Sequence, residues 1–148
     1  MVNENNIKDL DAKLLAQMLQ DFLEESQEHL DQLNLDLTKL EENPEHEELI
    51  NEIFRLSHTL KGLASFVGLD NFREVSHKME DVFGAVRNGT LKVTPELIDI
   101  MFQALEVLTI LRDKAITKDP LDVDISWIVQ KLVAALEKDT IDYVTHPK

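Results

Sequence analysis

The sequence predicts an all-α protein, an up-down-up-down antiparallel four-helix bundle with an additional C-terminal helix. Apolar residues recur at helical spacing along most of the chain, and no segment shows a convincing strand pattern. Only four glycines and four prolines occur among 148 residues, which favours long regular elements over many turns. Because short connections between long helices favour antiparallel neighbours, the expected arrangement is a bundle.

The first predicted helix runs from Leu10 to Leu40, about 45 Å at 1.5 Å per residue. Its apolar residues recur near heptad spacing at Leu15, Leu19, Phe22, Leu30, Leu33, Leu37 and Leu40. Pro44 ends this helix, because it disfavours helical geometry in the preceding Asn43. We expect Asn43 to cap the second helix, with Pro44 at its first position.

The second helix is predicted to end at Val67, where Gly68 suits the left-handed position that follows a helix. Its buried stripe is expected to contain Ile50, Ile53, Phe54, Ser57, Leu60, Ala64 and Val67. The third helix is predicted over residues 71–87 and stops at Asn88-Gly89. Its buried stripe is expected to contain Phe72, Val75, Met79, Val82, Phe83 and Val86.

Thr94-Pro95-Glu96 opens the fourth helix as cap, proline and acid, and Lys118-Asp119-Pro120 breaks it. Its apolar face includes Leu97, Ile100, Met101, Leu105, Leu108 and Leu111. A shorter fifth helix is predicted over residues 125–137, carrying Trp127, Ile128, Leu132 and Leu136. We expect residues 1–138 to form one domain and residues 139–148 to form a loose polar tail or the start of a linker.

The charge and composition of the chain exclude several function classes. The net charge is −14, with 29 Asp and Glu against 15 Lys and Arg, so we expect neither nucleic acid nor an anionic membrane as a partner. Since the chain has no cysteine, thiolate metal sites and disulfides are excluded. No signal peptide is visible at the start, and no apolar stretch approaches the roughly 20 residues that span a bilayer. A cytoplasmic location fits these features.

The candidate chemistry lies in Ser57-His58-Thr59-Leu60-Lys61-Gly62. On a helical wheel His58 falls roughly 60–80° outside the buried stripe, at about 100° per residue, so it is expected at the edge of the bundle and partly exposed. Gly62 costs about 1 kcal/mol relative to alanine inside a helix. This cost indicates that something approaches the backbone there; the alternative is tight packing of one helix on another.

Glu80, on the third helix, is the candidate partner of His58. It lies just beside the buried stripe marked by Met79 and Phe83, so it is expected to reach across the groove between the helices. A carboxylate that accepts one imidazole N–H leaves the other ring nitrogen as the nucleophile and makes it more basic. Lys61 is expected to neutralise the oxygens of an incoming phosphoryl group as a point charge.

Two stretches of the chain resemble a known family. His58-Thr59-Leu60-Lys61-Gly62 resembles the phosphoacceptor motif of histidine phosphotransfer (Hpt) domains. The longer run 53–68, with residues 76–81 and 85–89, is similar to the N-terminal phosphotransfer domains of chemotaxis histidine kinases. The resemblance covers about residues 10–136 and implies phosphoryl relay in two-component signalling.

The resemblance also implies roles for individual side chains. His58 is implied to be phosphorylated through the nitrogen that is not bonded to Glu80, with Lys61 and His77 as accessory polar residues.

The docking surface for partner domains is implied as well. Gly62 leaves room for the partner, and Leu63 and Phe66 are candidate docking residues. Leu63 departs from many relatives, which carry glycine or another small residue there. Phe66 falls on the outward side of the second helix.

The cofactors and catalytic machinery are implied to belong to the partners. ATP is bound by a histidine kinase ATP-binding domain, and magnesium is bound by the receiver domain of a response regulator, whose aspartate takes the phosphoryl group. No phosphate loop of the GxxxxGK type is present, so this domain is expected to hold no cofactor or metal and to have no autonomous catalysis. We expect it to form part of a protein histidine kinase.

Other functions remain open at this point. The chain fits a free-standing phosphotransfer protein of another phosphorelay, or a non-catalytic acidic helical adaptor. A di-iron bundle would need two Glu-x-x-His pairs, and only Glu74 to His77 supplies one. The oligomeric state is not specified by the sequence.

Overall fold

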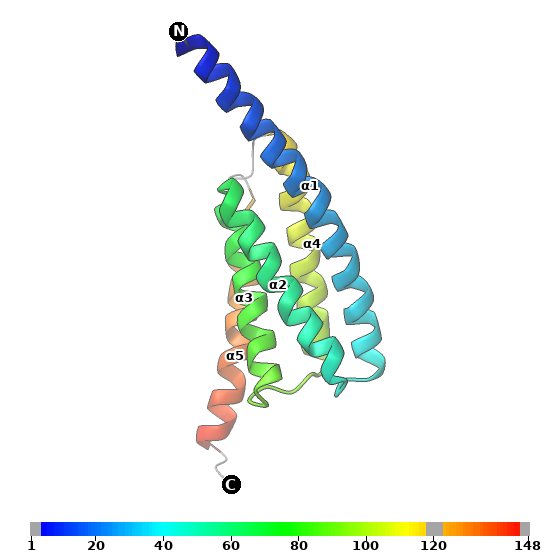
Figure 1. Cartoon of the computed structure of the whole chain (residues 1–148). Helices are drawn as coiled ribbons and strands as arrows, with labels where there is room; N and C mark the ends of the chain where they lie inside the picture. Colours follow the sequence, from blue (N-terminus) through cyan, green and yellow to red (C-terminus); the bar gives the residue numbers. More distant parts are fainter. Residues whose placement is uncertain (1–3, 118–122, 146–148) are drawn as a thin grey trace.

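The computed structural model describes residues 4–117 and 123–145, which form five α-helices and no strand within these ranges (Figure 1). The helices are α1 (Glu4–Glu42), α2 (Glu47–Val67), α3 (Asp70–Arg87), α4 (Pro95–Thr117) and α5 (Ser126–Thr145). The predicted all-α class is confirmed. Of the described helices, none has the length and apolar character needed to cross a membrane.

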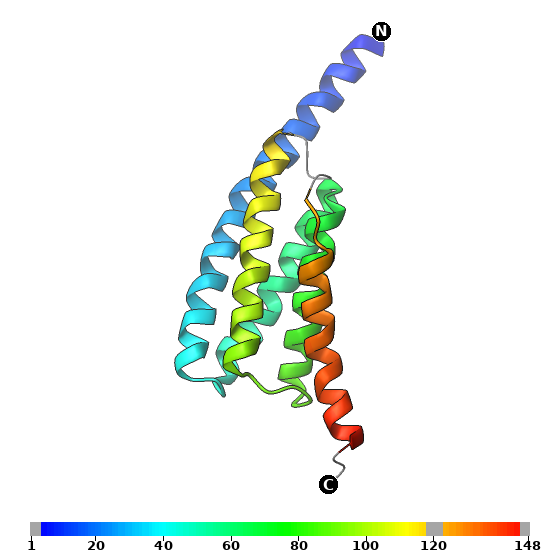
Figure 2. The ribbon, with the colours of Figure 1, turned by 180° about the vertical axis from the view of Figure 1, so that it is seen from behind.

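The first four helices alternate in direction and form a bundle, with α5 added along one side (Figures 1 and 2). α1 packs against α2 and α4, α2 packs against α3, and α3 packs against α4, which closes the ring of four. α5 packs against α3 and α4. This arrangement agrees with the predicted bundle and its additional C-terminal helix.

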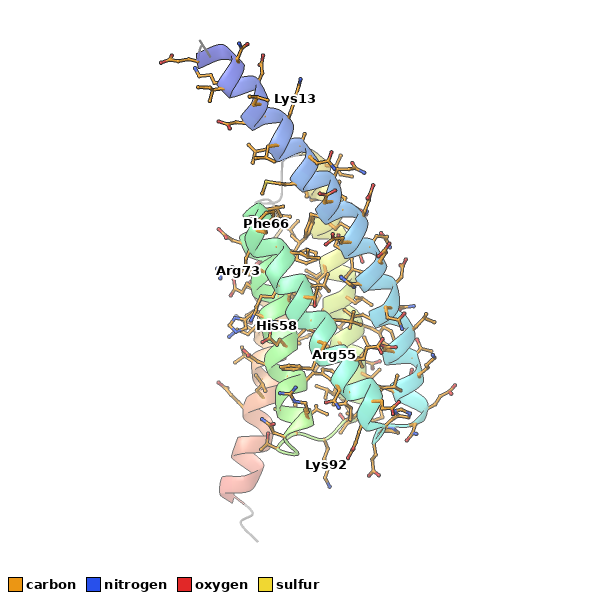
Figure 3. The ribbon with its side chains drawn as sticks, viewed as in Figure 1. Lys13, Arg55, His58, Phe66, Arg73 and Lys92 are labelled. Carbon is orange, nitrogen blue, oxygen red and sulfur yellow. The ribbon has the colours of Figure 1, made fainter. Side chains whose placement is uncertain are left out.

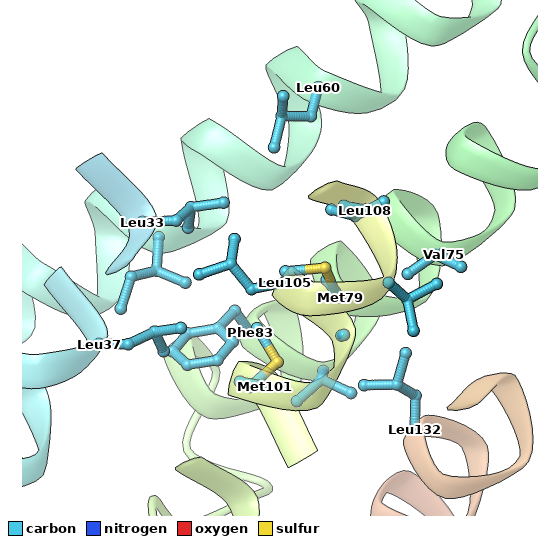
Figure 4. Close-up of a cluster of buried hydrophobic side chains, with 14 of the residues drawn as sticks. Leu33, Leu37, Leu60, Val75, Met79, Phe83, Met101, Leu105, Leu108 and Leu132 are labelled. Atoms are coloured by element: carbon cyan, nitrogen blue, oxygen red, sulfur yellow. The ribbon is translucent and has the colours of Figure 1, made fainter. Parts of the chain in front are cut away.

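The core runs along the inside of the bundle and contains side chains from all five helices (Figure 4). Its fully buried members include Leu33 and Leu37 of α1, Leu60 of α2, Met79 and Phe83 of α3, Met101 and Leu108 of α4, and Leu132 of α5. All six residues predicted for the α3 stripe are buried. Because Met79 is directed fully into this core, the next residue along α3 is left at the border facing α2.

α1 is longer than predicted, since it begins at Glu4, and its N-terminal part projects beyond the bundle (Figures 1 and 2). Leu15, assigned to the buried stripe, is 64% exposed, and Leu10 and Leu14 are exposed as well. Packing starts with Leu19 and Phe22. Periodicity belongs to the segment itself, whereas burial needs a neighbouring helix, and the bundle ends before this part of α1.

The predicted cap of α2 is wrong. His46 is the N-cap residue, and its Nδ1 accepts a hydrogen bond from the Leu49 N–H at 3.3 Å. The Asn43 N–H instead donates to the carbonyl oxygens of Lys39 and Leu40 and so ends α1. The two residues after Asn43 form a turn, and α2 therefore begins three residues later than the expected position of Pro44.

Two other helix boundaries agree with the prediction. Gly68 follows α2 with φ of 76°, in the left-handed region where a side chain would be strained. Its N–H donates to the Ser65 carbonyl, and the next N–H donates to the Ala64 carbonyl. Thr94 caps α4, because its Oγ1 accepts from the Leu97 N–H at 3.1 Å.

α5 continues to Thr145, so the end expected near Glu137 is wrong, and the segment expected to be loose from Asp139 is helical to that residue. Ile128 and Leu132 are buried, whereas Trp127 is exposed, with the Lys131 ammonium 5.5 Å from its ring centroid. The predicted break at residues 118–120 and the last three residues lie outside the described residues. The domain boundary at residue 138 stays a prediction.

Candidate functional site

His58 lies on the outer side of α2, with its side chain 64% exposed. Its neighbours Ser57 and Leu60 are fully buried, and Ser57 Oγ donates to the Ile53 carbonyl within the helix. Because these two residues fix which side of α2 faces the core, His58 is left at the edge beside α3. The predicted position of His58 is confirmed.

Glu80 of α3 reaches across to His58, as predicted. Its Oε2 lies 3.1 Å from His58 Nδ1, and its side chain is only 14% exposed. An ionised carboxylate can only accept a hydrogen bond, so Nδ1 carries the proton in the neutral imidazole. The bare nitrogen is therefore Nε2, the atom from which a nucleophile would act.

Lys61 completes a three-residue cluster, because its Nζ lies 2.9 Å from the same Glu80 Oε2. Partial burial raises the pKa of the Glu80 carboxyl, but the hydrogen bonds and charges of Lys61 and His58 outweigh burial and hold that pKa below its usual value. Glu80 is thus ionised at neutral pH and remains an acceptor for Nδ1. The Lys61 ammonium, which we expected to bind phosphoryl oxygens, pairs with Glu80 in this structure.

Gly62 does not pack against another helix. A Cβ built at this position meets no atom within 4 Å, so tight helix packing does not explain the glycine. The backbone of α2 is open to solvent here, one turn beyond His58. Space for an approaching molecule is present on the same side as His58.

The two other predicted docking residues differ in their surroundings. Leu63 is half-buried and packs against the core, so only part of it faces outward. Phe66 is 70% exposed, as expected for a residue on the outward side of α2. Of the pair, Phe66 offers the larger apolar surface to a partner.

His77 is half-exposed, and its Nε2 lies 3.6 Å from Asp81 Oδ1, so the two side chains form an ion pair when the imidazole is protonated. Its charge partner is therefore on its own helix, and the structure gives it no hydrogen bond to Glu80. Among the described residues, no three His, Cys, Asp or Glu side chains come together as a metal site would require. The Glu74-to-His77 pair thus lacks the further ligands of a di-iron centre.

Arg55 and Arg73 are exposed on α2 and α3, and the sequence reasoning did not single them out. Figure 3 shows them on either side of His58 along this face. A third cation, Arg87, lies with its guanidinium carbon 4.0 Å from the centroid of the Phe54 ring. A count of charges along α2 would have pointed to Arg55, but the place of Arg73 depends on how α3 packs.

Comparison with known proteins agrees with this geometry. The model of the Hpt domain family matches residues 17–139. The sensor histidine kinase CheAY of Helicobacter pylori is 40% identical over 94 residues, which are 64% of this chain and 12% of that protein. The chemotaxis protein CheA of Bacillus subtilis is 38% identical over 118 residues, 80% of this chain and 18% of that protein. The chain thus spans less than a fifth of these two curated relatives.

Two solved structures share the fold. The CheA phosphotransferase domain from Thermotoga maritima superposes with a TM-score of 0.64 at 40% identity, covering 66% of this chain and 93% of that one. A solution structure of the histidine phosphotransfer domain of CheA superposes with a TM-score of 0.72 at 35% identity, covering 78% of this chain and 89% of the other.

Proposed function

The chain belongs to the Hpt domain family, and from this premise we propose that His58 relays a phosphoryl group in chemotaxis-type two-component signalling. A histidine kinase domain donates the group from ATP, and an aspartate of a response regulator receives it. One observation carries the proposal: Glu80 Oε2 lies 3.1 Å from His58 Nδ1, which leaves Nε2 as the nucleophile on an exposed side chain.

In the first transfer, the lone pair of Nε2 attacks the γ-phosphorus of ATP, and ADP leaves with the electrons of the broken P–O bond. The imidazole keeps its proton on Nδ1, so the phosphorylated ring carries a positive charge. Glu80 holds that proton by a hydrogen bond and supplies the opposite charge next to it. The cluster therefore stabilises the product of the first step.

In the second transfer, an oxygen of the regulator's aspartate forms the new P–O bond. The electrons of the N–P bond return to Nε2, which regenerates the neutral imidazole with its proton still on Nδ1. No proton has to enter or leave His58 during the cycle. Glu80 thus serves both directions without changing its own protonation.

We assign Lys61 a shared role. Its ammonium has three N–H donors, and one of them contacts Glu80 in the present state. A phosphoryl oxygen on Nε2 accepts another of these donors, since His58 and Lys61 lie one turn apart on α2. His77 is an accessory residue that acts through the field of its pair with Asp81.

The partners supply the remaining chemistry in this proposal. ATP belongs to the kinase domain and magnesium belongs to the receiver domain, and residues 1–138 contribute the acceptor and its alignment. The supply of ATP places the first transfer in the cytoplasm.

Incubation of the chain with a chemotaxis kinase domain and radiolabelled ATP tests the proposal. We expect a phosphate that is labile in acid, stable in alkali and absent from His58→Gln. His77→Gln is the matched control, because it removes the other histidine of this region and is expected to keep the label. An active kinase domain that leaves the wild-type chain unlabelled would favour the adaptor function instead.

Labelling does not distinguish a domain of a kinase from a free-standing phosphotransfer protein. We favour the kinase domain, because the two relatives named above are a sensor histidine kinase, which matches 64% of this chain, and a CheA protein, which matches 80% of it.

A further inference from the structure

Acidic side chains are missing from the part of α2 that carries His58. The chain contains 29 Asp and Glu, yet residues 53–69 contain none, whereas Arg55 and Lys61 both fall in this run. Glu52, just before it, lies near Asp36 of α1: a hydrogen bond with Asp36 raises the pKa of the Glu52 carboxyl, whereas the charge of Arg55 lowers that pKa. The outer face of α2 is therefore basic in a protein whose net charge is −14.

Cations lie on both sides of His58 on this face. Arg55 precedes it by one turn of α2, and Arg73 comes from α3, near Phe66 (Figure 3). Both arginines are exposed. Lys61, between them, is held by Glu80, and the half-exposed Asp81 of α3 contacts His77 and Lys78 of its own helix. Arg55 and Arg73 are thus the exposed cations on either side of His58. We call the surface of Arg55, His58, Gly62, Phe66 and Arg73 the basic strip.

The basic strip combines charge with open apolar area. Phe66 is a large aromatic side chain left 70% exposed, and an added Cβ at Gly62 meets nothing within 4 Å. Aromatic and arginine side chains are the residue types enriched at protein interfaces. The neighbouring surfaces of α1 are acidic, with 11 Asp and Glu against three Lys in its sequence. An acidic protein is therefore attracted to this face and repelled elsewhere.

We propose that the basic strip is a docking surface for the acidic rim of a receiver domain. This inference rests on the proposed function, because it concerns the partner that takes the phosphoryl group from His58. The acceptor there is itself a carboxylate, and the magnesium beside it is usually held by one or two carboxylates together with several waters. The receiver thus presents clustered negative charge at the point that meets Nε2, and Arg55 and Arg73 face that charge on either side.

Exposed charges of this kind act mainly on the association rate. Opposite potentials steer two proteins into encounter and raise the rate by about tenfold or more at low salt. The effect falls as ionic strength rises, because the Debye length shrinks from about 30 Å at 0.01 M to about 8 Å at 0.15 M. Salt dependence of the transfer rate is therefore the direct readout.

The experiment separates the receiver step from the kinase step. The full 148-residue chain is phosphorylated with phosphoramidate, a small donor that needs no kinase, and is then mixed with a chemotaxis receiver domain and magnesium. The second-order rate of transfer is measured from 0.02 to 0.5 M salt, about the range over which screening changes most. The variants are Arg55→Glu and Arg73→Glu, each with its lysine counterpart, and the control is Lys92→Glu, the same charge change in the exposed segment before α4.

We expect each glutamate variant to slow transfer by roughly tenfold at low salt, with a smaller difference at high salt. The lysine variants and Lys92→Glu are expected to stay within about twofold of the wild type, since they keep the strip's charge. Wild-type transfer with unchanged rates in Arg55→Glu and Arg73→Glu would overturn the docking surface while leaving the relay intact. The same variants are also labelled with a kinase domain and ATP. If only this labelling is slowed and transfer to the receiver is not, the strip docks the kinase domain, and the proposed receiver surface is overturned. Absence of any transfer from labelled wild type would instead refute the relay itself.

Discussion

Lys61 Nζ lies 2.9 Å from Glu80 Oε2, the same oxygen that lies 3.1 Å from His58 Nδ1. One carboxylate oxygen on α3 thus binds two donors that stand one turn apart on α2. In the resting protein Lys61 acts on His58 only through Glu80, because its charge keeps that carboxyl ionised and directed toward the imidazole. The orientation of the nucleophile therefore depends on side chains of two helices.

Glu80→Gln is expected to slow phosphorylation of His58 by roughly 10- to 100-fold, the usual effect of removing a carboxylate that orients a functional histidine. A glutamine can accept at Nδ1 but carries no charge to balance the phosphorylated ring. The initial labelling rate with a kinase domain and ATP measures the effect, and circular dichroism checks that the helix content is retained. A labelling rate equal to that of the wild type would remove Glu80 from the site.

Lys61→Met is expected to move the pKa of Glu80 upward, toward its ordinary value, because a hydrogen bond and a charge that lower it are lost. A lowered carboxyl pKa stabilises the fold above the unfolded pKa of about 4.3, and this contribution is lost as pH falls through the folded pKa. The wild type therefore loses more stability than Lys61→Met on acidification, by about 1 kcal/mol or less. Carbon-13 NMR titration of the Glu80 carboxyl gives the pKa, with Lys78→Met as control.

A large residue at Gly62 is expected to leave the fold intact and to impair transfer to the regulator. A Cβ at this position meets no atom within 4 Å, and Gly62→Leu removes the helix cost of glycine, so stability rises by roughly 0.5–1 kcal/mol. The added side chain occupies the open space beside His58, which a partner needs. Gly62→Ala is the control, with the same gain in stability and a smaller block. Normal transfer in Gly62→Leu would leave the open backbone without a docking role.

Glu52→Gln is expected to stabilise the protein at neutral pH. Asp36 is 2% exposed, and in the described structure its Oδ2 has no donor, while Oδ1 accepts from Gln32 Nε2 at 2.9 Å. A hydrogen bond from the protonated Glu52 carboxyl to Asp36 is the main cause that raises the pKa of Glu52. Burial and the charge of Asp36 raise this pKa further. The protonated form is therefore favoured in the fold.

A carboxyl whose pKa is raised in the fold contributes stability that is fully present below the unfolded pKa of about 4.3. This contribution is lost as pH rises through the folded pKa. A glutamine supplies the N–H donor at every pH, so at pH 7 the free energy of unfolding of the variant should exceed that of wild type by roughly 0.5–1 kcal/mol. Thermal unfolding from pH 4 to 8 measures the difference, with the exposed Glu48→Gln as control. Parallel pH profiles for wild type and Glu52→Gln would show that the two carboxyls do not share a proton.

Local sequence patterns predicted most of the features that place His58. The spacing of Ser57 and Leu60 puts His58 at the edge of α2, and the position of Met79 turns Glu80 toward it, since both depend on helix geometry alone. The contact between Lys61 and Glu80 was not predicted in this way. The Lys61 ammonium takes the nearest carboxylate on α3, which only the packing of the two helices decides.

The cap of α2 and the burial of Leu15 were also mispredicted, for related reasons. Asn43 is a good capping residue by type, but its backbone closes α1, and His46 supplies the cap. Leu15 continues a heptad pattern, yet it is exposed, and the N-terminal part of α1 projects beyond the bundle (Figure 1). In both cases the residue type suited the role, and the lengths of neighbouring helices decided the outcome.

Deletion of residues 1–14 is expected to leave both the fold and His58 labelling unchanged. The described side chains before Met18 are exposed, the first core contact is made by Leu19, and the family match begins at residue 17. A helical segment without tertiary packing contributes little to stability, so the midpoint of thermal unfolding should move by less than about 2 °C. Phe22→Ala is the contrasting variant, because it removes a buried ring and should cost about 3–5 kcal/mol. A large fall in the midpoint after the deletion, with a smaller molecular mass in sedimentation, would show that the exposed leucines of α1 are covered in solution by a second copy of the chain.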